Sequence, residues 1–175
     1  LHRRQRQMCI RDSLNKVNKP MFWLKSGLFA VGLGMSFVYA IIPPLARDLG
    51  LSEIQASFIF SLSAVAWAMT SAPWGRASDK YGRRNIAILG YIGYSISMII
   101  LILPIYLADK NILSAAFVFP LLILGRTIYG LLGSATRPAS FAYVADITPK
   151  SKRTKKFARF ESNFLLGTLV GPLLG

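Results

Sequence analysis

The chain has 175 residues, of which 53% are hydrophobic and 16% are charged, and its formal net charge is +14. Soluble domains carry about 25% charged residues, so this chain is more apolar than the globular norm. Its basic residues alternate with uncharged stretches long enough to cross a bilayer instead of clustering on a polar fold, which excludes nucleic acid as the partner.

The first residues are unlike the rest of the chain. Residues 3–13 read RRQRQMCIRDS and resemble the in-frame translation of a sequencing adapter, so we expect residues 1–13 to be an artefact. The alternative is a basic leader, but the polar stretch LNKVNK follows where a signal peptide has its apolar core. His2 and Cys9 are the only histidine and cysteine. Residues 14–175 therefore offer no disulfide and no histidine-based metal site, and we expect no metal, no cofactor and no enzymatic activity.

Long uncharged stretches predict transmembrane helices. Three ranges contain no Asp, Glu, Lys or Arg: 26–46, 54–75 and 85–108. A bilayer-spanning helix needs about 20 mostly apolar residues, so each range is long enough. A fourth stretch, 111–145, is interrupted only by Arg126 and Arg137, and a fifth begins after Glu161 and is too short here to cross. The sequence predicts four complete helices and the start of a fifth, with Pro43-Pro44 ending the first.

The distribution of positive charge predicts an orientation. With residues 1–13 set aside, the flank before and at the start of the first helix, the second link and the fourth link together hold 13 Lys or Arg residues. The first and third links hold one each, Arg47 and Lys110. Positive charge favours the cytoplasmic side, so we expect a multi-pass protein of the cell membrane with a cytoplasmic N-terminus. We interpret the basic cluster at 150–159 as a determinant of this topology.

The second link, GRASDKYGRR at 75–84, holds the densest mixture of charges of both signs. Gly82 suits a turn with positive φ, and Gly75 permits the close approach of two helices. A carboxylate at the membrane boundary is costly unless it is paired. We therefore expect Asp79 to lie near the end of the second helix, within reach of Arg83.

This link resembles the signature of the major facilitator superfamily, G-x-L-A-D-R-x-G-R-R/K. The residues at its fixed positions are Gly75, Asp79, Gly82, Arg83 and Arg84. Ala77 and Lys80 replace the usual Leu and Arg. The resemblance implies a conformational latch in which Asp79 and Arg83 form a charge network with Asp146, at the end of the fourth helix. The alternative is that these charges only fix the topology.

Two further stretches resemble the same family. LGRTIYGLLGSA at 124–135 is similar to its fourth-helix pattern and contains Arg126 and Gly130. GTLVGPLLG at 167–175 is similar to the fifth-helix pattern G-x-x-x-G-P-x-x-G-G of its antiporter branch. The residues that match this pattern are Gly167, Gly171, Pro172 and Gly175. Their spacing of four places the glycines on one helix face, for close packing or for a gating bend at Gly171-Pro172.

The resemblance covers residues 14–175 and implies a fold and a function. The fold is an all-α membrane protein, here a partial N-terminal half of a twelve-helix bundle. The function is secondary transport by alternating access, nearest the drug/proton and tetracycline-type efflux antiporters. The implied partners are a small-molecule substrate, a proton as coupling ion, the lipid bilayer and the missing C-terminal half. The alternatives are an uptake symporter for a sugar or an organic anion, and a truncated membrane remnant without function.

Two arginines lie inside the predicted fourth helix. Arg126 and Arg137 are eleven positions apart, about three helical turns, so they share a face that could line a water-filled path. The resemblance implies that Arg126 takes part in proton coupling or bonds to the first helix; the alternative is an arginine capped by carbonyl groups. Arg137 either attracts an anionic substrate or extends toward the cytoplasm, and we favour the second. With no carboxylate in 26–46, and Glu161 placed at a helix end, we expect the proton carrier in the missing half.

Overall fold

The structure, a computed structural model, describes residues 2–48, 50–110, 113 and 115–174. Its helices are α1 (His2–Asp48), α2 (Glu53–Tyr81), α3 (Arg83–Asp109), α4 (Ala115–Leu131), α5 (Thr136–Asp146) and α6 (Arg153–Val170). Three short 3-10 turns accompany them, η1 (Gly133–Ala135), η2 (Lys150–Lys152) and η3 (Gly171–Leu174). The predicted all-α fold is confirmed over the described residues.

Four segments are long and apolar enough to cross a membrane. They are Met21–Asp48, Glu53–Tyr81, Arg83–Ala108 and Phe117–Asp146. The outer face of α3 shows why such a bundle needs lipid. Four isoleucines spaced three or four positions apart are exposed along it: Ile88, Ile92, Ile96 and Ile99. A continuous apolar stripe of this length is unfavourable in water, so it faces the hydrocarbon of the bilayer.

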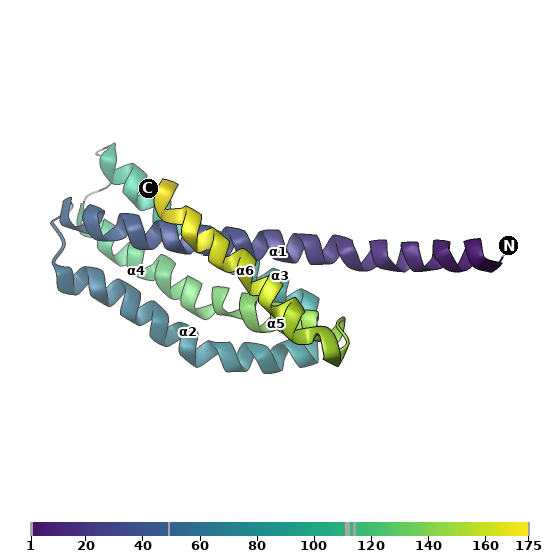
Figure 1. Cartoon of the computed structure of the whole chain (residues 1–175). Helices are drawn as coiled ribbons and strands as arrows, with labels where there is room; N and C mark the ends of the chain where they lie inside the picture. Colours follow the sequence, from purple (N-terminus) through teal and green to yellow (C-terminus); the bar gives the residue numbers. More distant parts are fainter. Residues whose placement is uncertain (1, 49, 111–112, 114, 175) are drawn as a thin grey trace.

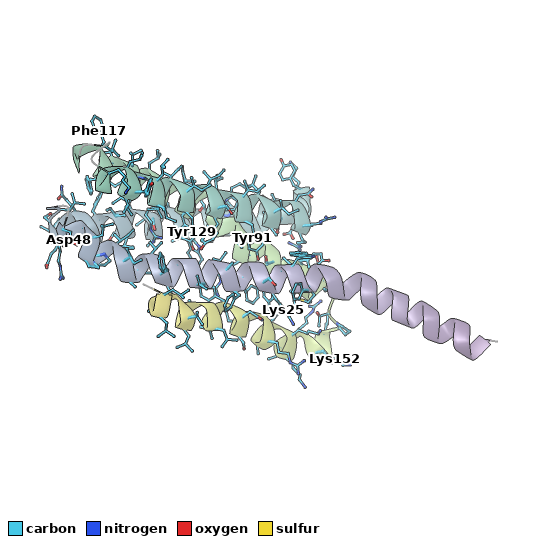
Figure 2. The ribbon with its side chains drawn as sticks, turned by 90° about the horizontal axis from the view of Figure 1, so that it is seen from above. Lys25, Asp48, Tyr91, Phe117, Tyr129 and Lys152 are labelled. Carbon is cyan, nitrogen blue, oxygen red and sulfur yellow. The ribbon has the colours of Figure 1, made fainter. Side chains whose placement is uncertain are left out.

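The two ends of the bundle differ in charge. We call the end where α2 meets α3 the basic end, because Arg83, Arg84 and the segment 150–159 lie there. The far end is where α1 meets α2. Figure 2 shows Lys152 at the basic end, Asp48 and Phe117 at the far end, and Tyr91 and Tyr129 in between.

Helix α1 is longer than expected at both ends. It begins at His2, and its first part projects beyond the other helices (Figure 1). It also continues through Pro43-Pro44 to Asp48, so the expectation that these prolines end the first helix is wrong. A proline removes its own N–H from the helical ladder but leaves its carbonyl as an acceptor, so a helix can pass through it at an energetic cost. The assignment of residues 1–13 to an artefact stays a prediction.

The fourth span is one membrane crossing but not one helix. Helix α4 ends at Leu131, η1 follows, and α5 resumes at Thr136. Pro138 explains the break, because it has no N–H for the carbonyl of Ser134 and its ring clashes with that carbonyl in a regular helix. The chain tightens into a 3-10 turn at that point, where Ser134 is fully buried.

Helices α1 and α6 cross at close range (Figure 1). A Cβ atom added at Gly167 would lie 2.2 Å from the carbonyl oxygen of Phe29, and one at Gly32 would lie 2.3 Å from that of Phe164. A Cβ at Gly171 would lie 2.7 Å from the carbonyl oxygen of Leu33. The predicted glycine stripe therefore packs against α1, backbone to backbone.

Two apolar clusters close the ends of the bundle and leave a polar middle. The cluster at the far end consists of Val38, Ile42, Ile59, Leu101, Val118 and Leu122. The cluster toward the basic end consists of Met21, Leu28, Val144 and Phe160. Between them lie a buried tyrosine pair, Tyr94 and Tyr129, with ring centroids 6.1 Å apart, and the charged residues described next.

Candidate functional site

The link between α2 and α3 is a single residue, Gly82. Its φ of 93° and ψ of 132° lie in a region that side-chain-bearing residues rarely adopt, in agreement with the predicted positive-φ turn. Because α2 continues to Tyr81, Asp79 lies in its last turn, and Arg83 is the first residue of α3. The turn thus brings the side chains of Asp79 and Arg83 close together.

Arg83 joins its own helix, α3, to two others, α2 and α5. It forms an ion pair with Asp79 of α2, and its Nε lies 3.1 Å from Oδ2 of Asp146 at the end of α5. Its Nη1 donates a hydrogen bond of 2.9 Å to Oγ of the buried Ser78, which itself donates to the carbonyl of Gly75. The side chains of Asp79 and Asp146 remain 60% and 57% exposed. Ion pairs this exposed contribute about 0–1 kcal/mol, so they can open at low cost.

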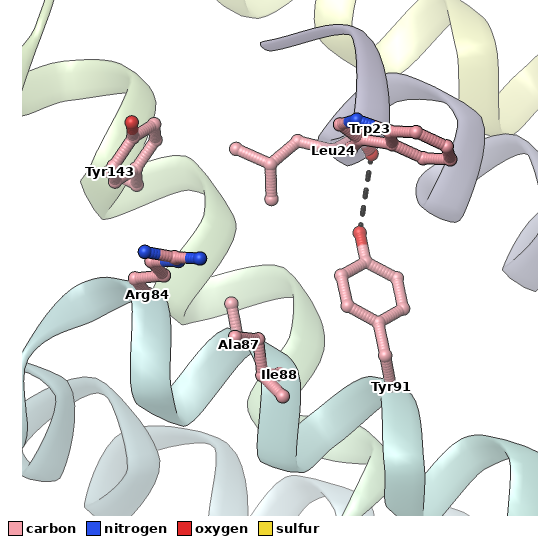
Figure 3. Close-up of a pocket in the computed structure, with 7 residues that line it drawn as sticks. All are labelled: Trp23, Leu24, Arg84, Ala87, Ile88, Tyr91 and Tyr143. Atoms are coloured by element: carbon pink, nitrogen blue, oxygen red, sulfur yellow. Dashed lines mark hydrogen bonds between the residues drawn. The ribbon is translucent and has the colours of Figure 1, made fainter. Parts of the chain in front are cut away.

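Two other residues of the link have different surroundings. A Cβ at Gly75 would meet its nearest neighbour, Cβ of Pro138, at 4.0 Å, which is ordinary contact. Among the described residues, no neighbour lies close enough to require a glycine at position 75, and the role of Gly75 in the latch stays a prediction. Arg84 is exposed and lines a pocket of about 510 Å³ with Trp23 and Tyr143 (Figure 3). In the wall of this pocket, Oη of Tyr91 donates to the carbonyl of Leu24 (3.2 Å).

Arg126 is enclosed by aromatic rings. It is 1% exposed, and its Cζ lies 5.4, 5.0 and 5.2 Å from the ring centroids of Tyr39, Phe60 and Tyr129. Its Nη2 donates a long hydrogen bond of 3.5 Å to Oη of Tyr39, whereas Nε and Nη1 have no acceptor among the described residues. The surroundings match the expected bonding to α1, through Tyr39, better than capping by carbonyls. A cation held by ring faces keeps its charge without a carboxylate.

Gly130 lies where α4 crosses α2. A Cβ there would lie 2.6 Å from the carbonyl oxygen of Ser63 and 2.7 Å from Cβ of Ala66. One turn further along α2, Oγ1 of Thr70 lies 3.0 Å from the carbonyl oxygen of Gly130. The glycine therefore permits the close approach that holds α4, and with it Arg126, against α2.

Arg137 is held by an acid and an aromatic ring of the next helix. It forms an ion pair with Glu161 of α6, and its Cζ lies 4.6 Å from the ring centroid of Phe164. The two charged side chains are 35% and 29% exposed. The acid neutralises Arg137 in this structure, and both expectations for Arg137, an anion site and extension toward the cytoplasm, stay predictions.

Glu161 is the residue that the sequence interpretation misplaced. Helix α6 begins at Arg153, so Glu161 lies two turns inside it and not at its end. The uncharged stretch used to predict the fifth helix starts only after Glu161, which hid the residue. The available signal was its isolation, because it is the one acid between Asp146 and the end of the sequence.

Arg137 is a charged residue that lines a small pocket in the middle of the bundle. The volume of this pocket is about 220 Å³, and its lining also includes Met35, Tyr39, Trp67, Tyr129 and Phe164. Tyr39 and Tyr129 also contact Arg126, which therefore lies behind the wall of this pocket. The part of the chain that the structure describes contains no group of three or more His, Cys, Asp or Glu side chains that could hold a metal ion.

The remaining site residues lie at the end of α6. Regular helix gives way to the 3-10 turn η3 at Gly171, and the exposed Pro172 is its second residue. Gly175 lies outside the described residues. The local change of helix type coincides with the predicted bend at Gly171-Pro172.

Comparison with known proteins places the chain in a family. The sequence pattern of the Major Facilitator Superfamily matches residues 26–175. The chain is 26% identical over 159 residues to "Quinolone resistance protein NorA" of Staphylococcus aureus strain Mu50, covering 91% of this chain and 38% of that protein. It is also 26% identical over 162 residues to "Uncharacterized MFS-type transporter MJ1560" of Methanocaldococcus jannaschii, covering 93% of this chain and 39% of that protein. The chain thus spans about two fifths of the length of these relatives, and it belongs to the major facilitator superfamily of membrane transporters.

Proposed function

We propose that this chain supplies the N-terminal part of a secondary active transporter that exports drug-like molecules in exchange for protons. The observation that carries the proposal is the position of Arg83, which is paired with Asp79 on one side and with Asp146 on the other. Three helices that form one face of a transporter half are thereby fastened by a cation whose partners are both exposed. Such a fastening suits a state that must open and close in each cycle.

The proposed orientation places the basic end in the cytoplasm and the protein in the cell membrane. The sequence segments that gather there carry 13 of the Lys and Arg residues, against two in the links at the far end. Membrane proteins keep such positively charged segments on the cytoplasmic side. The Arg83 network would then act as a cytoplasmic latch, closed while the substrate path is open to the outside.

Export coupled to protons is the finer part of the proposal. Arg126 supports it, because a buried guanidinium whose Nε and Nη1 have no acceptor among the described residues strongly favours the charged form of any acid brought near it. The relative from Staphylococcus aureus is named for quinolone resistance, so a quinolone is a rational first substrate to try. Uptake of an organic anion loses its main support, since Glu161 already neutralises Arg137.

The test is transport in everted membrane vesicles that contain the full chain as its gene encodes it. A fluorescent quinolone should accumulate when a proton gradient is imposed, and a protonophore should abolish the accumulation. Accumulation that survives the protonophore would contradict proton coupling. If correctly inserted protein gives no accumulation under any gradient, the result would favour the alternative of a truncated membrane remnant without function.

A further inference from the structure

We infer that Glu161 is a proton-binding residue of this transporter and that Arg137 is the internal cation that competes with the proton for it. The inference deepens the proposed function of proton-coupled transport and rests on it. It differs from the latch at the basic end, because it concerns a different pair of charges, deeper in the bundle.

The depth of the pair is the first argument. Glu161 lies eight residues after the start of α6, and Arg137 lies nine residues before the end of α5. At about 1.5 Å of rise per residue, both lie about 12–14 Å from the basic end of their helices. Arg137 lies inside the fourth span, Phe117–Asp146, and a carboxylate beside it there is too costly to keep without a partner or a function. The structure supplies the partner, Arg137.

The second argument is the state of the carboxylate. One oxygen, Oε1, receives Arg137, whereas Oε2 is buried and has no hydrogen-bond partner among the described residues. A buried, charged oxygen without a donor is unfavourable. Protonation at Oε2 removes the charge, and a neutral carboxyl group costs less to bury than a carboxylate. Oε1 of Glu161 is therefore paired with Arg137, and Oε2 is the oxygen that would take up a proton.

The third argument is that Arg137 has somewhere to go. Its guanidinium already lies 4.6 Å from the ring centroid of Phe164, and it lines the pocket of about 220 Å³. If Glu161 is protonated, the guanidinium of Arg137 keeps its contact with the ring of Phe164 and can move further into the pocket. Breaking the pair does not leave a bare charge in an apolar wall, as it does for most buried ion pairs.

Other charges and tyrosines lie near the pair. Arg137 of α5 is the one Lys or Arg within ion-pair distance of Glu161 in the described part of the chain. On its own helix, Lys156 and Arg159 of the basic cluster precede Glu161 by five and two residues. Helix α1 contributes Tyr39, across the pocket that Arg137 lines. Helix α4 contributes Tyr129, at the pocket, and Arg126 behind it. The described part of α2 that lines the pocket is uncharged.

The step is a simple proton exchange. A hydronium ion from the aqueous path transfers its proton to Oε2, water is released, and the contact between Oε1 and Nη2 of Arg137 opens. The pair changes from a net charge of zero to one positive charge facing the pocket. Loss of the proton to water on the other side restores the carboxylate and the ion pair, which closes the cycle.

The test combines infrared spectroscopy with transport, in the full chain reconstituted into vesicles. Infrared difference spectra recorded between low and high pH should contain a carboxylic acid C=O band that disappears in Glu161→Gln. The control, Glu53→Gln, changes an acid at the far end whose side chain is 86% exposed, and the band should persist there. Transport driven by a proton gradient should fall about tenfold or more in Glu161→Gln, while substrate counterflow without a gradient changes less than about twofold, as expected when only coupling is lost.

The single variant leaves Arg137 unpaired and could fail to insert. The double variant Glu161→Gln, Arg137→Gln removes both charges and leaves no buried ion. It should show the same loss of the infrared band and of gradient-driven transport. A band that persists in both variants, or gradient-driven transport that is unchanged in both, would overturn the inference and leave the proposed function intact. A titrating band at Glu161 in a protein that transports nothing would instead overturn the proposed function.

Discussion

Nε of Arg83 lies 3.1 Å from Oδ2 of Asp146, although the two residues are 63 positions apart in the sequence. The pair joins the first residue of α3 to the last residue of α5, and the same guanidinium pairs with Asp79 of α2. Because both acids are exposed, the network adds little to stability, and its effect should be on the balance between conformations.

Replacing Asp146 should therefore shift a conformational equilibrium. Asp146→Asn removes the pair that reaches α5, and we expect the state open at the basic end to become more populated. Ala64 of α2 lines the pocket of about 220 Å³ in the middle of the bundle. The measurement is the rate at which a membrane-impermeant maleimide, added at the basic end, labels an Ala64→Cys variant in which Cys9 is changed to Ser. Labelling should rise about fivefold, within the usual range of conformational coupling. The matched control is Asp48→Asn, an exposed acid at the far end, and equal rates in both variants would contradict the latch.

Gly82 and Gly75 allow a sharp comparison of two glycines in one link. Gly82→Ala forces a side chain into a φ of 93° and should destabilise the protein by about 1–3 kcal/mol. Gly75→Ala adds a Cβ with ordinary contacts inside a helix and should be neutral or slightly stabilising. Thermal unfolding of the two purified variants in detergent gives the difference. Equal melting temperatures would contradict the positive φ at position 82.

The crossing of α1 and α6 should be sensitive to a single methyl group. Gly167→Ala places Cβ 2.2 Å from the carbonyl oxygen of Phe29, so the two backbones must separate. Overpacking of this kind costs about 1–3 kcal/mol, and we expect a lower melting temperature and weaker insertion. Ser162→Ala, on an exposed position of the same helix, serves as the control and should leave the melting temperature unchanged.

The ring faces around Arg126 should matter more than its hydrogen bond. Tyr39→Phe removes the 3.5 Å bond but keeps the ring, so gradient-driven transport should stay within about twofold of the parent. Tyr39→Leu removes the ring face and should lower that transport about tenfold, and Arg126→Lys should do the same because an ammonium cannot stack as a guanidinium does. Vesicle transport of the fluorescent quinolone measures all three. A larger loss in Tyr39→Phe than in Tyr39→Leu would contradict the importance of the rings.

The sequence predicted those features that depend on neighbouring residues. Uncharged stretches are enough to find the four spans, and the spacing of Asp79, Gly82 and Arg83 is enough to predict a turn that pairs acid with base. The break before Pro138 could be suspected from the same local rules, whereas the continuation of α1 through Pro43-Pro44 contradicted them. Local propensity is overridden there by the packing of the whole helix.

The features that the sequence interpretation missed depend on tertiary contacts. No spacing rule relates Arg137 to Glu161, which come together only because α5 and α6 lie side by side. The three rings around Arg126 come from α1, α2 and α4, and their convergence is a property of the bundle. The helices were predicted as stretches without charged residues. Any acid therefore falls at the end of a predicted helix or outside it, and Glu161 was misplaced for this reason.

The break in the fourth span has a mechanical consequence. Where α4 ends, the carbonyl of Leu131 accepts hydrogen bonds from Nε1 of Trp74 in α2 (2.6 Å) and from Oγ of Ser134 (3.1 Å). With Thr70 close to the carbonyl of Gly130, α2 is fastened to the fourth span at its weakest point. Helices α2 to α5 thus pack mainly against one another, and α1 packs mainly against α6 through the glycine crossing. The ion pair of Arg137 and Glu161 joins α5 of the first group to α6 of the second, so a change of charge there acts directly on the contact between the two groups.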